Sequence, residues 1–242
     1  MRLPFPLMPT SPSFQVRISG DLAVFSRPEL KAERMSYPIP TPSALRGAIE
    51  AIFWKPAIRW QVTQIQILNP IRFKTFLRNE VNKKAPAPSA AIVADGGEAP
   101  QLLAEDERAQ RNTVALRDVD YLVTVKFELT KRAGPEENVK KFEEIFLRRL
   151  GKGQHFHQPY LGCRECIADV RPSDPSEPGE PISESTDFGL VLWDIDFSGK
   201  KNRPVFFHAL MENGSIQIPA SIEEAKASVL QFATNQGGGA HV

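Results

Sequence analysis

The sequence is short of several features that mark common classes of protein. It has two cysteines in 242 residues, and no apolar run approaches the roughly 20 residues that span a bilayer. Lysine and arginine together number 30 and aspartate and glutamate 29, so the formal net charge is only +1. Two cysteines exclude a disulfide scaffold, and the short apolar runs argue against a membrane protein. With so little net charge, any surface for an anionic partner must be a local patch.

Several catalytic signatures are missing as well. The chain has neither GxxxxGK(S/T) nor GxGxxG after a strand, and no spacing that indicates a Ser/His/Asp triad or carboxylates for two-metal chemistry. Prolines interrupt the first residues, MRLPFPLMPTSPSF, which is untypical of a signal peptide. We therefore expect a cytoplasmic protein with reduced thiols and no resident cofactor.

The most informative stretch is residues 36–60, SYPIPTPSALRGAIEAIFWKPAIRW. Cations hold phosphate and flat rings stack on unpaired bases, so mixed basic and aromatic residues suit a nucleic acid. The plainer interpretation is an amphipathic helix on a sheet, with Trp54 and Trp60 in the core. The pattern alone leaves both open. The residues concerned are Tyr37, Arg46, Phe53, Trp54, Lys55, Arg59 and Trp60.

Periodicity predicts an α+β fold. A helix begins at Thr41-Pro42, with apolar positions at Leu45, Ala48, Ile49 and Ile52, and ends at Pro56. A second helix is expected over 137–150. Strands are expected at 14–26, 58–68, 71–81, 163–170, 187–197 and 203–219 (turning at Asn213-Gly214), with a hairpin formed by 110–119 and 120–130.

This order of elements predicts a ferredoxin-like or RRM-like antiparallel sheet with two helices on one face, followed by a small C-terminal antiparallel β-sheet. The Pro/Ser/Glu-rich segment 172–185 marks the expected boundary. The predicted organisation is an RRM-like RNA-binding domain (1–171), a small β-sheet domain (172–219) and a flexible tail (220–242). Residues 82–104, rich in Ala, Pro and Gly, are predicted to form a mobile loop.

The second predicted helix carries a basic side. Lys140, Lys141, Arg148 and then Lys152 could face a phosphate backbone. Glu144 lies four residues from both Lys140 and Arg148, so a solvated salt-bridge ladder is the alternative. The spacing does not decide between them.

Two histidines and two cysteines are the best candidates for metal ligands in the sequence. His155 and His157 precede the Cys-x-x-Cys of Cys163 and Cys166, and all four residue types ligate zinc. One such knuckle is weak, and a strand over 163–170 would send the two cysteines to opposite faces, so we predict no metal site. The histidines alternate in a loop and titrate near neutral pH, which favours either acid/base chemistry or simple capping of the backbone.

Four segments taken in order resemble a known family: SYPIPTPSALRGAIEAIFWKP, NPIRF, QRNT and GQHFHQPYLGCRE. They are similar to the fifth CRISPR-associated (Cas) family in its type I-C (Dvulg) form, from about Phe14 to Pro219. The resemblance implies an endoribonuclease that cuts the repeat hairpin of precursor CRISPR RNA. It also implies that the protein stays on the 5′ handle with the other Cascade subunits. The implied reaction needs no metal, because the ribose 2′-hydroxyl attacks and leaves a 2′,3′-cyclic phosphate and a 5′-hydroxyl.

The resemblance also implies where the site lies. The family's tyrosine before Trp-Lys-Pro falls on Phe53, which has no hydroxyl, and its Lys-His pair falls on Lys140 and Lys141. His155 and His157, or Tyr37, would then supply the missing proton transfer, or Lys141 would act as base.

The expected RNA contacts are a set of cations, with Tyr37 or Phe53 stacking on a base. A non-catalytic subunit that caps the RNA is the main alternative, and a zinc-bound RNA-binding module is a third. Duplex DNA is a further candidate partner, in a salt-sensitive side activity. The predicted contact cations are Arg46, Lys55, Lys140, Lys141, Arg148 and Lys152.

Overall fold

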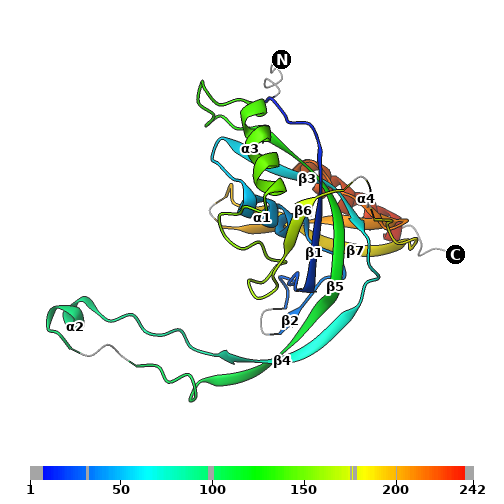
Figure 1. Cartoon of the computed structure of the whole chain (residues 1–242). Coiled ribbons are helices and arrows are strands. Elements are labelled where there is room, and N and C mark those ends of the chain that lie inside the picture. Colours follow the sequence, from blue (N-terminus) through cyan, green and yellow to red (C-terminus); the bar gives the residue numbers. More distant parts are fainter. Residues whose placement is uncertain are drawn as a thin grey trace.

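The computed structural model describes residues 8–30, 33–97, 101–174, 176, 179–199 and 201–237. It shows an α+β fold, in which helices lie against a large, mainly antiparallel sheet (Figure 1). In the described part of the chain, no helix is long and apolar enough to span a bilayer. The elements are β1 (Phe14–Ala23), β2 (Arg34–Met35), α1 (Pro42–Ile52), β3 (Ile58–Ile67), β4 (Phe73–Val81), α2 (Ala90–Ala94), β5 (Arg108–Leu129), α3 (Val139–Gly151), β6 (Asp169–Pro172), β7 (Thr186–Asp196), β8 (Arg203–Glu212), β9 (Ser215–Gln217) and α4 (Ile222–Gly237).

The predicted ferredoxin-like arrangement is confirmed in one half of the sheet. The order β6-β1-β5-β3 places the fourth, first, third and second strands of a βαββαβ unit side by side, and each neighbouring pair is antiparallel. Helices α1 and α3 pack on one face of this unit. Aromatic rings fill the space between them: the Trp60 ring centroid is 4.6 Å from that of Phe146 and 5.1 Å from that of Phe127. Trp60 is therefore a core residue, as the plainer interpretation expected.

The C-terminal strands extend the same sheet. Strand β9 pairs with β3 through Gln64 and Gln217, and β8 and β7 follow outward from β9. The predicted turn at Asn213-Gly214 joins β8 to β9, with φ angles of 48° and 71°. Helix α4 packs against β8, and residues 238–242 of the predicted tail lie outside the described residues. The division into domains at residue 172 stays a prediction. The hydrogen bonding of the sheet is continuous from the N-terminal strands to the C-terminal ones.

The predicted hairpin of 110–119 and 120–130 is wrong. These residues belong to one 22-residue strand, β5, which continues through Asp118 at a φ of 52°. The polar residues Arg117 to Asp120 resemble a turn in sequence, but Arg117 and Val119 both pair with β1. The N-terminal half of β5 pairs instead with β4, and the two form an arm that projects from the body and carries α2 towards its tip (Figure 1).

The structure differs from two local predictions, the end of helix α1 and the strand over 163–170. Helix α1 starts as expected, with the Thr41 side chain accepting from the Ala44 amide at 3.3 Å. It ends at Ile52, four residues before Pro56. The predicted strand over 163–170 is wrong in its first half, because the Cys166 amide donates to the Cys163 carbonyl at 2.9 Å and closes a turn. Cys163 and Cys166 therefore lie in a turn, and strand periodicity does not send their side chains to opposite faces of the sheet.

Candidate nucleic-acid interface

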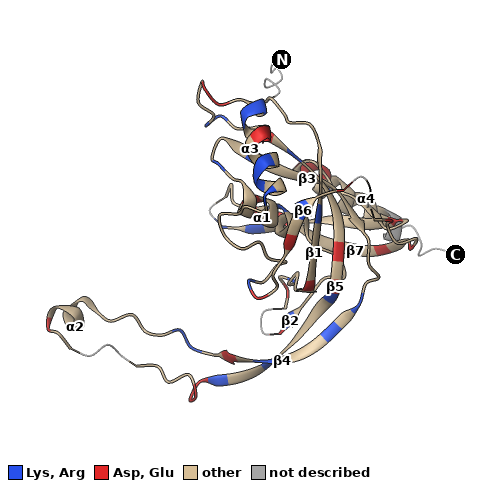
Figure 2. Ribbon diagram, viewed as in Figure 1, with Lys and Arg blue, Asp and Glu red and all other residues tan. Residues whose placement is uncertain are grey.

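Helix α3 presents a basic face to solvent. Its start is capped by the Asn138 side chain, which accepts from the Lys141 amide at 2.9 Å. Phe142, Phe146 and Leu150 are buried and turn the opposite side of the helix outward. Figure 2 shows blue segments along this helix, interrupted by acidic residues.

Four cations on or next to α3 are exposed and unpaired. Within the described residues, no ion-pair partner lies within 4.0 Å of Lys140, Lys141, Arg148 or Lys152. The alternative of a salt-bridge ladder through Glu144 is therefore not seen. These side chains can approach a phosphate backbone without first giving up a protein partner.

The length of α3 separates the two pairs predicted to act together. Lys140 and Lys141 lie in its first turn, whereas His155 and His157 are exposed in the loop after its end. At 1.5 Å per residue, Lys140 and Gly151 are roughly 16 Å apart along the axis. Along the axis of α3, the lysine pair thus lies about three turns from the start of the loop that carries the histidines.

Phe53, at the position of the family's tyrosine, belongs to the core. It is 2% exposed, and its carbonyl accepts from Trp60 Nε1 at 2.8 Å. Its ring lies 5.8 Å from that of Phe142 and 5.4 Å from the Arg149 guanidinium. Arg149 also donates to the Ile52 carbonyl at 3.0 Å. A ring held in this way cannot stack on a base.

Tyr37 is also removed from the surface. It is 2% exposed, and the Arg27 guanidinium covers its ring at 4.9 Å. Burial, with the nearby Glu29 carboxylate, raises the pKa of its hydroxyl. The predicted stacking or proton-transfer role therefore has no exposed group to perform it.

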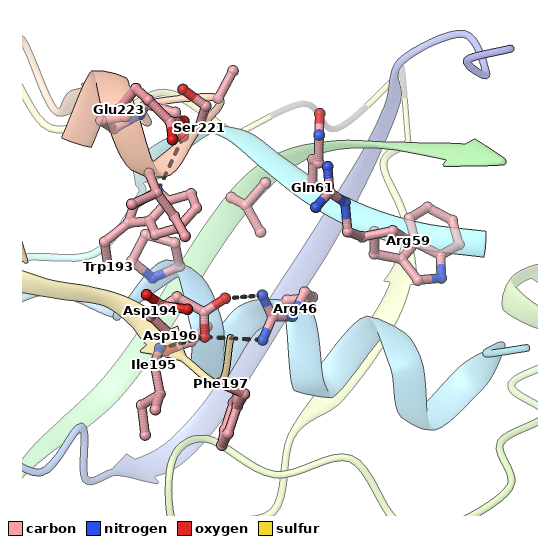
Figure 3. Close-up of a pocket in the computed structure, with 17 residues that line it drawn as sticks. Arg46, Arg59, Gln61, Trp193, Asp194, Ile195, Asp196, Phe197, Ser221 and Glu223 are labelled. Atoms are coloured by element: carbon pink, nitrogen blue, oxygen red, sulfur yellow. Dashed lines mark hydrogen bonds and ion pairs between the residues drawn. The ribbon is translucent and has the colours of Figure 1, made fainter. Parts of the chain in front are cut away.

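Arg46 is engaged within the protein. It makes a two-bond ion pair with Asp194 of β7, one bond of 3.1 Å between Nη2 and Oδ1 (Figure 3). Its Nε also lies 3.6 Å from a Glu50 carboxylate oxygen. The cavity beside it measures about 440 Å³ and is also lined by Asp196 and Glu223. Burial raises the pKa of the Glu50 carboxyl against the opposing effect of Arg46. Arg46 thus links α1 to β7. Three carboxylates, those of Asp194, Asp196 and Glu223, outnumber Arg46 and Arg59 in the lining, which makes the cavity poorly suited to phosphate.

Lys55 is intermediate between the unpaired cations of α3 and the internally paired Arg46. Its side chain is 46% exposed, 3.8 Å from a Glu137 carboxylate oxygen, and its ammonium is 5.9 Å from the Phe142 ring centroid. An exposed pair of this kind contributes about 0–1 kcal/mol, so Lys55 can exchange it for a phosphate.

Two aromatic residues are exposed. Trp54 is 55% exposed, which fits the nucleic-acid interpretation and contradicts the plainer one, and Phe156, which no sequence pattern singled out, is 89% exposed. Phe156 lies between His155 and His157, beside a hollow also lined by Arg149. The signal was available: a lone phenylalanine between two histidines fits no apolar period, so packing does not explain it.

The possible metal ligands are not assembled into a site. Cys163 is half-buried and Cys166 buried, and the Arg34 guanidinium donates to Cys163 Sγ at 3.4 Å. Burial raises the pKa of the Cys166 thiol to about 11. Among the described residues, no group of three or more His, Cys, Asp and Glu side chains is arranged to hold a metal ion.

Comparison with known proteins identifies relatives over most of the chain. The family model described as "CRISPR-associated protein (Cas_Cas5)", in its Cas5d version, matches residues 14–219. A protein from Mannheimia succiniciproducens named CRISPR pre-crRNA endoribonuclease Cas5d is 41% identical, over 85% of this chain and 94% of the relative. One of the same name from Thermus thermophilus is 38% identical, over 85% and 91%. A crystal structure of a CRISPR-associated protein shares the fold, with a TM-score of 0.66 and 24% identity over 90% of this chain and 96% of the other.

Proposed function

The chain belongs to the Cas5 family of CRISPR-associated proteins, in its Cas5d (type I-C) form, and we propose on that basis that it is an endoribonuclease of precursor CRISPR RNA. The observation that carries the proposal is the identity of 41% and 38% with two proteins of that name, spanning 94% and 91% of their length. The exposed, unpaired cations of α3 support it, because an RNA backbone needs such a surface.

The chemistry requires an RNA held in line. The 2′-oxygen beside the scissile phosphate attacks phosphorus, the bond from phosphorus to the 5′-oxygen breaks, and the products carry a 2′,3′-cyclic phosphate and a 5′-hydroxyl. The protein must orient these atoms, accept the 2′ proton, return a proton to the 5′-oxygen and offset the charge on the phosphorane.

We place proton transfer at the histidine end of α3. His155 lines the same hollow as Arg149, and Arg149 reaches back to Ile52 and Phe53, where the family's tyrosine falls. His155, helped by His157, would exchange the protons. Arg149 and Lys152 would offset the phosphorane charge.

The other end of α3 would hold the RNA at a distance from the cut. Lys140 and Lys141 lie in the first turn of α3, roughly 16 Å along the axis from its last residue, Gly151, and would bind backbone phosphates there, together with Lys55. Arg148 would bind between the two ends. The competing assignment makes Lys140 and Lys141 the catalytic pair, as the family motif suggests.

Cleavage of end-labelled cognate repeat RNA in EDTA tests the proposal. Wild type should cut the RNA and should leave a control with a 2′-deoxy nucleotide at the cut site intact. His155→Ala/His157→Ala should slow cutting by about 10²–10⁴, the usual cost of losing a general base. Lys140→Ala/Lys141→Ala should weaken binding but cut normally at saturating protein. The reverse pattern would assign catalysis to the lysines.

A second function is favoured by Phe53 alone. This buried ring carries no hydroxyl where the family has one, so a subunit that binds the RNA and does not cut it is the alternative. Binding without cleavage in the same experiment would establish it. In either case we propose that the protein stays on the 5′ handle with the other subunits of the surveillance complex. Any binding to duplex DNA would be weak and salt-sensitive.

A further inference from the structure

Phe156 has an exposure that packing does not explain. At 89% it is the most exposed large apolar side chain in the described part of the chain, ahead of Leu230 at 68% and Phe197 at 67%. Burying a phenylalanine ring stabilises a fold, so a ring left in water forgoes that stabilisation. A ring of this size in solvent is a candidate contact for a partner.

The loop that carries Phe156 is pinned to both helices. The Phe156 amide donates to the Ala51 carbonyl of α1 at 2.7 Å, and the Gln154 amide donates to the Arg149 carbonyl of α3 at 2.9 Å. Gly153 takes a φ of 61°, which turns the chain away from the helix end. The backbone at Phe156 is thus held in place while the ring points outward, which lowers the entropy cost of binding.

We propose that Phe156 is a stacking platform for one unpaired base of the RNA. The inference rests on the proposed function, since it names a nucleotide contact on the same surface. Arg149 and His155 line the hollow beside the ring, so a phosphate contact is available next to it. Lys152 caps α3 just before the loop. The His157 ring lies 6.2 Å from Phe156 in an edge-on orientation, and 6.2 Å from Tyr160, so three rings lie near one another in this loop.

The surroundings favour a nucleotide over a protein segment. A protein partner would need apolar neighbours around Phe156, because the cores of protein interfaces are depleted in charge. The hollow beside Phe156 is instead lined by Arg149, Gly153, Gln154 and His155. A flat ring among cations and histidines matches a base with its phosphate.

The test is binding of uncleavable RNA, with 2′-deoxy at the cut site, in two forms: the repeat hairpin with its single-stranded flanks, and the stem alone. Phe156→Ala should weaken binding of the flanked RNA by roughly 5- to 150-fold, the usual range for one base–aromatic stack, and leave stem binding unchanged. Phe156→Trp should restore it. One flank position labelled with 2-aminopurine should be quenched by wild type and not by Phe156→Ala.

Phe197→Ala is the matched control. Phe197 is the same residue type at 67% exposure, but it lies beside the cavity lined by Asp194, Asp196 and Glu223, so its loss should change neither RNA affinity nor quenching. Unchanged binding by Phe156→Ala would overturn the inference and leave a protein contact as the use of this ring. An equal loss on the stem alone would also overturn it. This binding test uses uncleavable RNA and so does not depend on cleavage. If wild type fails to cut normal repeat RNA, the nuclease proposal is refuted, and the binding test of Phe156 can still be read.

Discussion

Replacing Arg46 by alanine should destabilise the fold and spare RNA binding. The Arg46 side chain is 30% exposed and that of Asp194 is 17%, and Glu50 lies 3.6 Å from the same guanidinium. Removing Arg46 leaves two carboxylates facing each other in a partly buried site. Breaking a buried pair costs about 3–5 kcal/mol and an exposed pair about 0–1, so we expect about 2 kcal/mol here.

Thermal unfolding and RNA binding by fluorescence anisotropy measure the two effects separately. For a chain of this size, about 2 kcal/mol corresponds to a fall in Tm of about 4–8 °C. In a double-mutant cycle, Asp194→Ala should cost less in the Arg46→Ala background than in wild type, because it removes a carboxylate that has lost its partner.

Arg148→Ala is the matched control, since Arg148 is exposed and has no ion pair with a described residue. It should change Tm by no more than about 1–2 °C, as surface substitutions do, and should weaken RNA binding. If Arg46→Ala instead weakened RNA binding at an unchanged Tm, Arg46 would have to leave Asp194 for the RNA. Its assignment as a link between α1 and β7 would then be wrong.

Three further predictions follow from local features. The pKa of Glu50 is raised in the folded protein, so its contribution to stability is fully present below the ordinary carboxyl pKa and is lost as pH rises through the folded-state pKa. In urea unfolding, Glu50→Gln should therefore be more stable than wild type at pH 7 and should lose that advantage at pH 4. Gly162→Ala should cost at least about 2 kcal/mol, because φ is 83° and the added Cβ would lie 2.0 Å from the Val24 carbonyl oxygen. Gly153→Ala, at φ 61° in open space, should cost only about 1 kcal/mol, and similar losses in Tm for both would contradict the steric argument. Lys140→Ala/Lys141→Ala should lower the slope of log affinity against log salt by about 1.4 if both contact single-stranded RNA, and an unchanged slope would remove them from the interface.

The sequence was most informative where local rules and packing agree. The cap at Thr41 and the apolar positions of α1 follow from spacing alone, and all four predicted positions are buried. The ferredoxin-like order likewise follows from the succession of elements. The strand β5 was misassigned because a single residue in the left-handed region, Asp118, has the same sequence signature as a turn, and only its pairing with β1 distinguishes the two.

The site was less predictable because exposure is a property of the whole fold. Arg46 reads as a surface group by residue type, and the basic and aromatic pattern placed Tyr37 and Phe53 with it. The partners of Arg46 and Phe53 instead come from segments distant in sequence: Asp194 for Arg46, Phe142 and Arg149 for Phe53. The cations of α3 were anticipated, because the apolar stripe of an amphipathic helix also locates its solvent side. The roughly 16 Å along the axis from Lys140 to the end of α3 follows only once that end is known.

The pairing of β1 with β5 has a consequence for biosynthesis. Phe14 pairs with Val125 and Ala23 with Leu116, so each residue of the first strand lacks its neighbour on that side until 93 to 111 more residues have been made. Its other neighbour, β6, follows later still, since Val16 pairs with Pro172. At about 5–20 residues per second, the apolar residues of β1 wait roughly 6–20 s on the ribosome without a partner strand. During that interval the nascent chain carries an unpaired strand edge, which makes it a substrate for chaperones and sets the earliest moment at which the sheet can close.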